Sequence, residues 1–228
     1  MRVAEIYRSV QGEGFLTGTR SVFVRASGCN LRCWFCDTPQ ASWSPVGKDL
    51  SVDEITSRIE EWDCRHVVLT GGEPMLFSEL IPLAEKLRRA GLHITVETAG
   101  TLYLPVACDL MSISPKLANS TPTKQRDARW HRRHELARHV PEVVQRLIAE
   151  FDYQIKFVVD APEDFEEIQR YLEALPQIDR SRVMLMPQGI EVKELIEKSQ
   201  WIEPYCEAHG LRFCPRRQIE WFGLVHGT

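Results

Sequence analysis

The sequence has no apolar run approaching the ~18–20 residues that a membrane-spanning helix needs, and its first residues lack the apolar core of a signal peptide. It also lacks a basic excess. Its 28 Lys and Arg against 32 Asp and Glu leave a net charge of −4, which excludes a generally basic nucleic-acid binder. No repeat, low-complexity tract or linker divides the 228 residues, so we expect a single domain spanning 1–228.

The seven cysteines do not form the evenly paired set of a secreted disulfide framework. Their odd number in a chain of ordinary domain size favours a reducing compartment. We therefore expect a cytoplasmic protein whose partners are neither membranes nor nucleic acids. Four cysteines are expected to be small buried hydrophobes, namely Cys64, Cys108, Cys206 and Cys214.

After about residue 50, short β-rich apolar runs alternate with segments of helical periodicity. The predicted strands cover 66–70, 93–97, 110–114, 153–159, 182–186 and 211–214. The predicted helices cover 52–62, 76–90, 165–175 and 192–205. Repeated βα units imply right-handed crossovers and a parallel sheet. There are too few units for a closed eight-stranded barrel, so the expected fold is α/β, an incomplete parallel β/α barrel.

Three cysteines, Cys29, Cys33 and Cys36, lie in one short segment that follows a predicted strand. Functional loops of α/β sheets lie at the carboxyl ends of strands. Three thiolates there suit a cubane iron–sulfur cluster with one open iron, because such clusters usually take four cysteines. A structural zinc site would need a fourth ligand, and the nearest candidates, Cys64 and His66, lack paired spacing. A non-catalytic zinc module and a buried structural trio stay as alternatives.

Polar motifs also follow other predicted strands: TGGEP at 70–74, ETAG at 97–100 and SISPK at 112–116. Glycines let a backbone approach a ligand closely, and Glu73 can accept hydrogen bonds from an amine. Parallel strands end at one rim, so these residues are expected to face a common ligand site. Gln188, in the MPQG segment at 186–189, is a weaker candidate, and a simple turn is an equal alternative there. A Gly-Gly turn alone is more often a plain βα loop.

The C-x3-C-x2-C spacing, with Trp34 and Phe35 before the third cysteine, resembles the signature of the radical S-adenosylmethionine (SAM) superfamily. The resemblance implies a 4Fe–4S cluster whose open iron chelates SAM, and a 5′-deoxyadenosyl radical formed by reductive cleavage of SAM. It also implies an electron donor such as flavodoxin or ferredoxin. The cofactors supply this chemistry, while the protein orients and shields it.

A narrower resemblance begins with the QGEG loop at 11–14, which on spacing alone would equally fit a plain hairpin turn. That loop, Arg25, the cysteine trio, Asp37-Thr38 and the three strand-end motifs are together similar to the 7-carboxy-7-deazaguanine synthase family. The similarity is specific from Gln11 to Lys116 and loose beyond. It implies a lyase that converts 6-carboxy-5,6,7,8-tetrahydropterin to 7-carboxy-7-deazaguanine, with loss of ammonia, in queuosine and 7-deazapurine biosynthesis. This radical ring contraction regenerates SAM, and the resemblance further implies a homodimer.

The resemblance also implies roles for individual residues. Substrate contacts are implied for Val10, Gln11, Gly12, Arg25 and Thr70. SAM contacts are implied for Phe35, Cys36, Asp37, Gly72, Ser114, Pro115, Lys116 and Gln188. The cluster ligands are Cys29, Cys33 and Cys36, and Thr38 is implied as a magnesium ligand. Arg25 is chemically apt, because a guanidinium can hold a carboxylate bidentately; the alternative is a structural ion pair with Glu5 or Glu13.

Other features stay open. Several members have a histidine in the last strand, where this chain offers Arg217 or Gln218, and the tail at 224–228 is longer than in members whose terminal carboxylate approaches the substrate. The basic stretch from Lys116 to His139 is expected to be a solvated insertion or helix face, with a phosphate- or RNA-facing patch as the alternative. The rival function is an activating enzyme that installs a glycyl radical on a partner enzyme. It would share the cysteine trio, but the QGEG loop argues against it.

Overall fold

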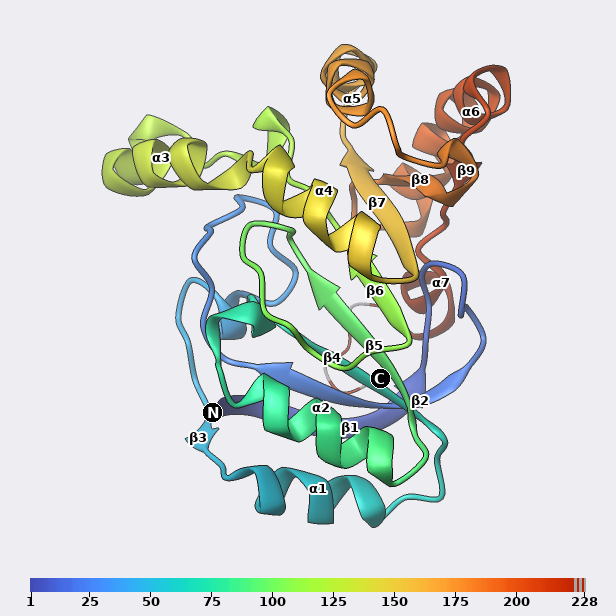
Figure 1. Ribbon diagram of the computed structural model, residues 1–228. Helices are drawn as coiled ribbons and strands as arrows, with labels where there is room; N and C mark the ends of the chain where they lie inside the picture. Colours follow the sequence, from blue (N-terminus) through green and yellow to red (C-terminus); the bar gives the residue numbers. More distant parts are fainter. Residues whose placement is uncertain (224, 226, 228) are drawn as a thin grey trace.

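A single nine-stranded sheet organises the computed structural model, which describes residues 1–223, 225 and 227 (Figure 1). The strand order is β3-β1-β2-β4-β5-β6-β7-β8-β9. Every neighbouring pair from β2 to β9 is parallel, as the βα alternation predicts, whereas β1 pairs antiparallel with both β2 and β3. No pairing among the described residues joins β9 back to the first edge, so the sheet stays open. The prediction of an incomplete barrel is confirmed.

The parallel strands are β2 (Arg20–Ala26), β4 (His66–Gly71), β5 (His93–Thr98), β6 (Leu110–Ile113), β7 (Tyr153–Val159), β8 (Val183–Pro187) and β9 (Arg212–Phe213). The antiparallel edge consists of β1 (Arg2–Val10) and β3 (Lys48–Asp49). All of β6 and residues 67–70 of β4 are buried. Strands covered on both faces need apolar side chains on both, which explains why the sequence shows short continuous apolar runs.

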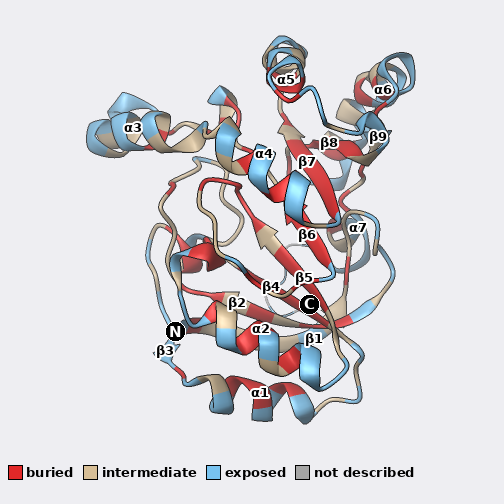
Figure 2. Cartoon of the chain, viewed as in Figure 1, coloured by how far each residue is buried: buried red, intermediate tan, exposed pale blue. Residues whose placement is uncertain are grey.

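The helices are α1 (Val52–Glu60), α2 (Leu80–Arg89), α3 (Lys124–Arg138), α4 (Pro141–Glu150), α5 (Asp164–Glu173), α6 (Val192–His209) and α7 (Arg217–Phe222). Figure 2 shows buried residues along the strands and on the sides of the helices that face them. α1 begins with the capping box that its sequence indicates, because the side chains of Ser51 and Glu54 each accept a hydrogen bond from the other's backbone N–H. α3 differs from the rest: it projects from the sheet, and His134 is its only buried residue.

Some boundaries differ from the sequence prediction. The helix expected from residue 76 begins at Leu80, because the chain first makes a 3₁₀ turn over Pro74–Leu76. α6 continues past the predicted end to His209, where Gly210 supplies the left-handed residue (φ 66°) that ends many helices. The predictions did not include α4 or α7. Most of the basic stretch forms α3, a largely exposed helix.

One hydrophobic core runs from β1 to α6 along the sheet, and a small second cluster joins Met184, Met186 and Cys214 near the pocket side of β8. Cys108, Cys206 and Cys214 are buried as predicted, whereas Cys64 is only partly buried. Among the described residues, no helix is both long enough and apolar enough to span a membrane.

Candidate active site

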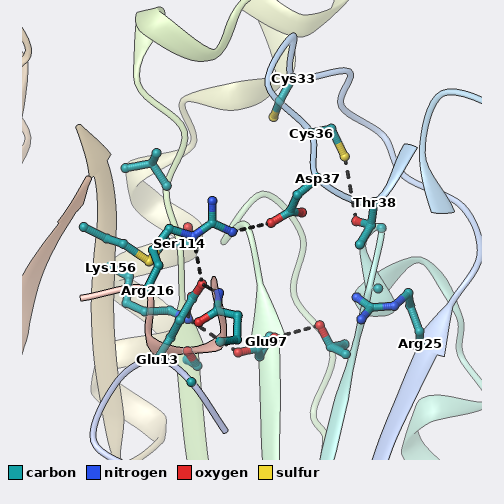
Figure 3. Close-up of a pocket in the computed structure, with 18 of the residues that line it drawn as sticks. Glu13, Arg25, Cys33, Cys36, Asp37, Thr38, Glu97, Ser114, Lys156 and Arg216 are labelled. Atoms are coloured by element: carbon teal, nitrogen blue, oxygen red, sulfur yellow. Dashed lines mark hydrogen bonds and ion pairs between the residues drawn. The ribbon is translucent and has the colours of Figure 1, made fainter. Parts of the chain in front are cut away.

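The carboxyl ends of the parallel strands open into a pocket of about 330 Å³ (Figure 3). The β1–β2 loop, the cysteine loop, the ends of the central strands and α7 supply its walls. The predicted substrate residues that line it are Val10, Gln11, Gly12, Arg25 and Thr70. The other predicted residues that line it are Cys29, Cys33, Phe35, Cys36, Asp37, Thr38, Gly72, Ser114, Lys116 and Gln188. Pro115 is the exception, since it is buried and does not line the pocket.

Hydrogen bonds within the cysteine loop and from the residues around it hold its backbone in place. Gly28, at a φ of 142° that side-chain-bearing residues rarely adopt, donates its N–H to Ala41 O (2.9 Å). The Arg32 guanidinium donates to the carbonyls of Cys29 and Leu31, both at 2.7 Å. Trp43 donates its indole N–H to Cys33 O (2.8 Å). These backbone contacts hold the loop, and its thiols make further contacts, with Leu31 N donating to Cys29 Sγ (3.4 Å) and Ser42 Oγ lying 3.1 Å from Cys36 Sγ.

The three thiols of this loop are unpaired and face a common pocket. Burial raises the pKa of Cys29 to about 12 and that of Cys33 to about 11. No three His, Cys, Asp or Glu side chains in the described part of the chain lie close enough together to bind one metal ion. Because the three thiols do not form such a group, they suit ligands to separate irons better than ligands to a single zinc. With iron in place of their protons, the three sulfurs at the pocket wall would be soft ligands that fit a 4Fe–4S cluster with one iron free of protein ligands.

Close backbone packing joins the cysteine loop to the loop after β4. A Cβ on Gly72 would lie 2.1 Å from Gly28 O, so only glycine fits there. Glu73 is fully buried, and its carboxylate accepts hydrogen bonds from Met75 N (3.0 Å), Thr98 Oγ1 (2.9 Å) and Ala99 N (2.8 Å). Glu73 does not line the pocket. It therefore braces the rim between β4 and β5, and its expected contact with a ligand amine finds no support in this geometry.

Arg25, near the end of β2, lines the pocket (Figure 3). It is also ion-paired with Glu5. Its Nε donates to Glu5 Oε1 and its Nη2 to the Tyr7 hydroxyl, both at 2.6 Å. Burial opposes the charge, but Tyr7 and Glu5 raise the pKa of Arg25, so it stays protonated. Nη1 has no hydrogen-bond acceptor among the described residues. The ion pair with Glu5 is therefore present, and it orients a guanidinium that still has a free edge.

A buried charged network forms the floor of the pocket. Lys156 of β7 is 4% exposed, and its Nζ lies 2.9 Å from Glu13 Oε2 and 3.4 Å from Glu97 Oε1. Glu97 also accepts a hydrogen bond from Thr70 Oγ1 (2.7 Å). Burial would lower the pKa of Lys156, but the charges of Glu13 and Glu97 raise it. Burial would raise the pKa of Glu13, but Lys156 and Arg216 lower it to about 2, so Glu13 is ionised at neutral pH.

The C-terminal segment extends this network to the cysteine loop. Arg216 donates through Nη2 to Asp37 Oδ2 (2.5 Å), and Gln218 donates through Nε2 to Glu13 Oε1 (2.5 Å). Gln218 Oε1 is buried without a hydrogen-bond partner. Of the two C-terminal candidates, Gln218 lines the pocket, whereas Arg217 pairs with Glu220 (2.6 Å) outside it. The expectation about the tail at 224–228 falls partly outside the described residues, which omit 224, 226 and 228.

The sequence reasoning did not single out Lys156 or Arg216. Lys156 lies inside the apolar strand β7. Because a lysine is almost never fully buried without a partner, its place in that strand could have indicated a buried ion pair. Arg216 lies just past the last predicted strand, where nothing in the local pattern distinguishes it from a surface residue. Its partner Asp37 is 179 positions away.

Side chains after β6 and β8 that are expected to contact SAM make hydrogen bonds of their own. Lys116 donates to Ser114 O (2.6 Å) and Ser114 Oγ (2.8 Å), which fixes the loop after β6. The Gln188 side chain accepts from Lys198 Nζ (3.2 Å), and Lys198 also pairs with Asp160 (2.7 Å). These contacts orient the side chains of Ser114, Lys116 and Gln188, which still line the pocket.

Comparison with known proteins identifies relatives of the chain. The radical SAM superfamily model matches residues 23–117. The 7-carboxy-7-deazaguanine synthase of Rhodopirellula baltica is 44% identical over 227 residues, covering 99% of this chain and 88% of that protein. The synthase of Halobacterium salinarum is 41% identical, covering 95% and 88%.

Among solved structures, QueE from Escherichia coli matches 95% of this chain and 93% of its own, with a TM-score of 0.70 and 23% identity. SuiB from Streptococcus suis, bound to its precursor peptide, matches 84% of this chain and 47% of its own, with a TM-score of 0.55. These likenesses show a shared fold.

Proposed function

The chain belongs to the 7-carboxy-7-deazaguanine synthase family, and on that basis we propose that it converts 6-carboxy-5,6,7,8-tetrahydropterin to 7-carboxy-7-deazaguanine and ammonia. One observation carries the proposal. The cysteine loop, the QGEG loop, Arg25 and the strand-end motifs come from separate parts of the chain and line one pocket. The relatives favour this function over the glycyl-radical activating enzyme and the zinc module.

The cofactors are a 4Fe–4S cluster and SAM, which supply the radical chemistry when bound. Cys29, Cys33 and Cys36 would hold the cluster. Residues of the cysteine loop and the strand ends would hold SAM, namely Phe35, Asp37, Gly72, Ser114, Lys116 and Gln188. Pro115 would act from behind the rim by shaping the loop between Ser114 and Lys116. The chain's task is to place SAM beside the substrate and to exclude water.

Arg25 would bind the carboxylate of the pterin. Two of its three nitrogens are already engaged by Glu5 and Tyr7, which fixes the plane of the guanidinium. The free Nη1 edge lies on the pocket wall, where it can donate to a carboxylate oxygen. Val10, Gln11 and Gly12 would form the adjoining wall, with Thr70 at the end of the neighbouring strand.

The charged floor would bind the pterin ring. A pterin carries amine and ring N–H donors along one edge, and carboxylates accept such hydrogen bonds strongly. Glu13 and Glu97 lie on the floor with Lys156 between them, so their orientation is fixed before substrate enters. Gln218 Oε1 is a further buried acceptor without a partner.

Thr38 would bind magnesium together with the substrate. Its hydroxyl does not cap the 3₁₀ turn Pro39–Ala41, which removes the simplest structural role for it. It lines the pocket, 3.8 Å from Cys36 Sγ. Mg²⁺ takes hard oxygen ligands and usually keeps several waters, so one hydroxyl plus substrate oxygens is a reasonable set.

We further propose that the chain works as one radical SAM domain, in the cytoplasm, as a homodimer. One sheet and one main core support the single domain, and seven unpaired cysteines among the described residues are compatible with a reducing compartment. Light scattering of the purified protein tests the dimer, because it measures the mass of the particle in solution directly.

The function is tested by anaerobic incubation with the carboxylated pterin, SAM, a reductant and magnesium. Mass spectrometry should detect 7-carboxy-7-deazaguanine, and analysis of the same preparation should find iron and sulfide. Zinc without sulfide and no deazapurine would refute the proposal.

A further inference from the structure

One basic surface of the molecule takes no part in the pocket. It is the α3 face, which we define as Lys124, Arg126, Arg129, Arg132 and Arg133. All five residues are exposed, and Asp127 is the only acidic residue in the segment 124–134. The chain as a whole carries a net charge of −4, so this positive charge is a local concentration. In Figure 1, α3 projects away from the sheet, where its charges are accessible.

The α3 face is built directly onto the cysteine loop. The guanidinium of Arg32, between Cys29 and Cys33, lies 4.1 Å from the centre of the Trp130 ring in α3. Arg126 donates from Nη1 to Trp34 O (2.9 Å), and Trp34 lies between Cys33 and Cys36. One positive charge of the α3 face, Arg126, therefore contacts the backbone of the loop that would carry the cluster.

The helix is anchored despite its projection. The backbone leaves helical geometry at Asp127, whose carboxylate accepts a hydrogen bond from Trp130 N (2.8 Å) and so caps the turns that follow. His134 is fully buried, and its Nδ1 accepts from Arg32 N (3.1 Å). Nε2 therefore carries the ring proton and donates to Ser120 Oγ (2.9 Å). These bonds hold α3 in a fixed position relative to the cysteine loop.

We propose that the α3 face is the docking surface for the enzyme's electron donor, an acidic protein of the flavodoxin type. This rests on the proposed function, since only a redox cluster in the adjoining loop requires such a donor. One electron leaves the donor's reduced flavin and enters the oxidised cluster, so the donor is oxidised by one electron and the cluster is reduced by one.

The positive charge of the α3 face and the exposed ring of Trp34 both favour this partner. A concentrated positive surface attracts an acidic protein and steers its approach, which raises association rates by about 10- to 1,000-fold at low salt. Trp34 is 41% exposed beside the α3 face, and offers an apolar ring to the apolar edge of a flavin. Nucleic acid would also be attracted by the charge, but it gives no reason for the surface to be anchored to the cysteine loop.

The test reverses two positive charges of the α3 face that have no structural contacts in the described part of the chain. Arg129 and Arg132 make no hydrogen bond, ion pair or ring contact with the described residues, so Arg129→Glu/Arg132→Glu should fold normally. The matched control is Arg58→Glu/Arg89→Glu, which makes the same charge change on exposed positions of α1 and α2. These helices lie at the opposite end of the molecule from α3 (Figure 1).

Cluster reduction is followed by the loss of visible absorbance after mixing with reduced flavodoxin, and separately with dithionite, which needs no docking. At low ionic strength, the α3 variant should be reduced by flavodoxin about tenfold or more slowly than the wild type, and at an unchanged rate by dithionite. The control should match the wild type with both reductants. Added salt should slow the wild type towards the rate of the α3 variant.

Equal flavodoxin rates for the wild type and the α3 variant would overturn the proposal. The proposal would also be overturned if the α3 variant were slowed equally with both reductants and the milder Arg129→Gln/Arg132→Gln variant showed the same equal slowing. RNA binding or a dimer lost in the variant, with flavodoxin reduction unchanged, would reassign the surface. Dithionite-driven pterin turnover does not need this surface, so its absence would count against the proposed function alone.

Discussion

Replacing Arg25 with Lys should weaken substrate binding while leaving SAM cleavage possible. The guanidinium presents three nitrogens in one plane: Nε to Glu5, Nη2 to Tyr7 and Nη1 to the pocket. A lysine ammonium keeps the charge but cannot serve Glu5, Tyr7 and a carboxylate in that geometry. Losing one charge-assisted hydrogen bond costs about 1.5–3 kcal/mol. At 1.36 kcal/mol per tenfold, kcat/KM for the pterin should fall about 10- to 150-fold.

The assay measures deazapurine formation at several pterin concentrations, and 5′-deoxyadenosine formation without pterin. Tyr7→Phe is the matched control, because it removes one partner of Arg25 and keeps the ring that stacks on Phe23 (5.2 Å). The bond from Arg25 to Tyr7 orients the guanidinium and does not itself hold the substrate, so losing it should cost less, about 1 kcal/mol, and a roughly fivefold loss is expected. Unchanged pterin kinetics in Arg25→Lys would refute the assignment. Loss of uncoupled SAM cleavage to the same extent would instead place Arg25 in the structure of the cluster site.

Three further predictions concern other parts of the site. Thr38→Ala should weaken the magnesium dependence of turnover at unchanged iron content, and Thr38→Ser should keep most of it; an unaltered magnesium response in Thr38→Ala would remove Thr38 from the metal site. Cys108→Ala should retain iron, sulfide and visible absorbance while Cys33→Ala loses them, and equal loss in both would contradict a cluster held by the trio alone. The pKa of Glu13 is lowered from 4.5 to about 2 in the folded protein. Ionised Glu13 therefore stabilises the fold by about 3 kcal/mol above pH 4.5, and this stabilisation is lost as the pH falls towards 2. The difference in free energy of unfolding between wild type and Glu13→Gln, measured with urea, should therefore become smaller as the pH falls through that range. A difference that does not change with pH would show that the charge of Glu13 does not stabilise the floor.

The sequence was informative where the determinants are local. Runs such as His66–Gly71 and Tyr153–Val159 are apolar and β-rich, so their strands were predictable within one residue or two. The cysteine spacing and the strand-end motifs were also predictable as site residues, because parallel strands end at one edge. The open barrel followed from the number of βα units.

The charged floor was not predictable, because its pairs are distant in sequence. Lys156 and Glu13 are 143 positions apart, and Arg216 and Asp37 are 179 apart. Such contacts depend on how the β1–β2 loop and the last helix close over the sheet, which no local period records. For Glu73, the motif suggested a ligand contact, but burial and three backbone or hydroxyl donors use its carboxylate within the fold.

The central claim is that this pocket performs a ring contraction on a carboxylated pterin while SAM is regenerated. The most direct measurement is the ratio of 7-carboxy-7-deazaguanine formed to SAM consumed, under anaerobic conditions with dithionite and magnesium. A ring contraction that regenerates SAM should give many product molecules, with equal ammonia, for each SAM lost. Stoichiometric conversion of SAM to 5′-deoxyadenosine without deazapurine would contradict it.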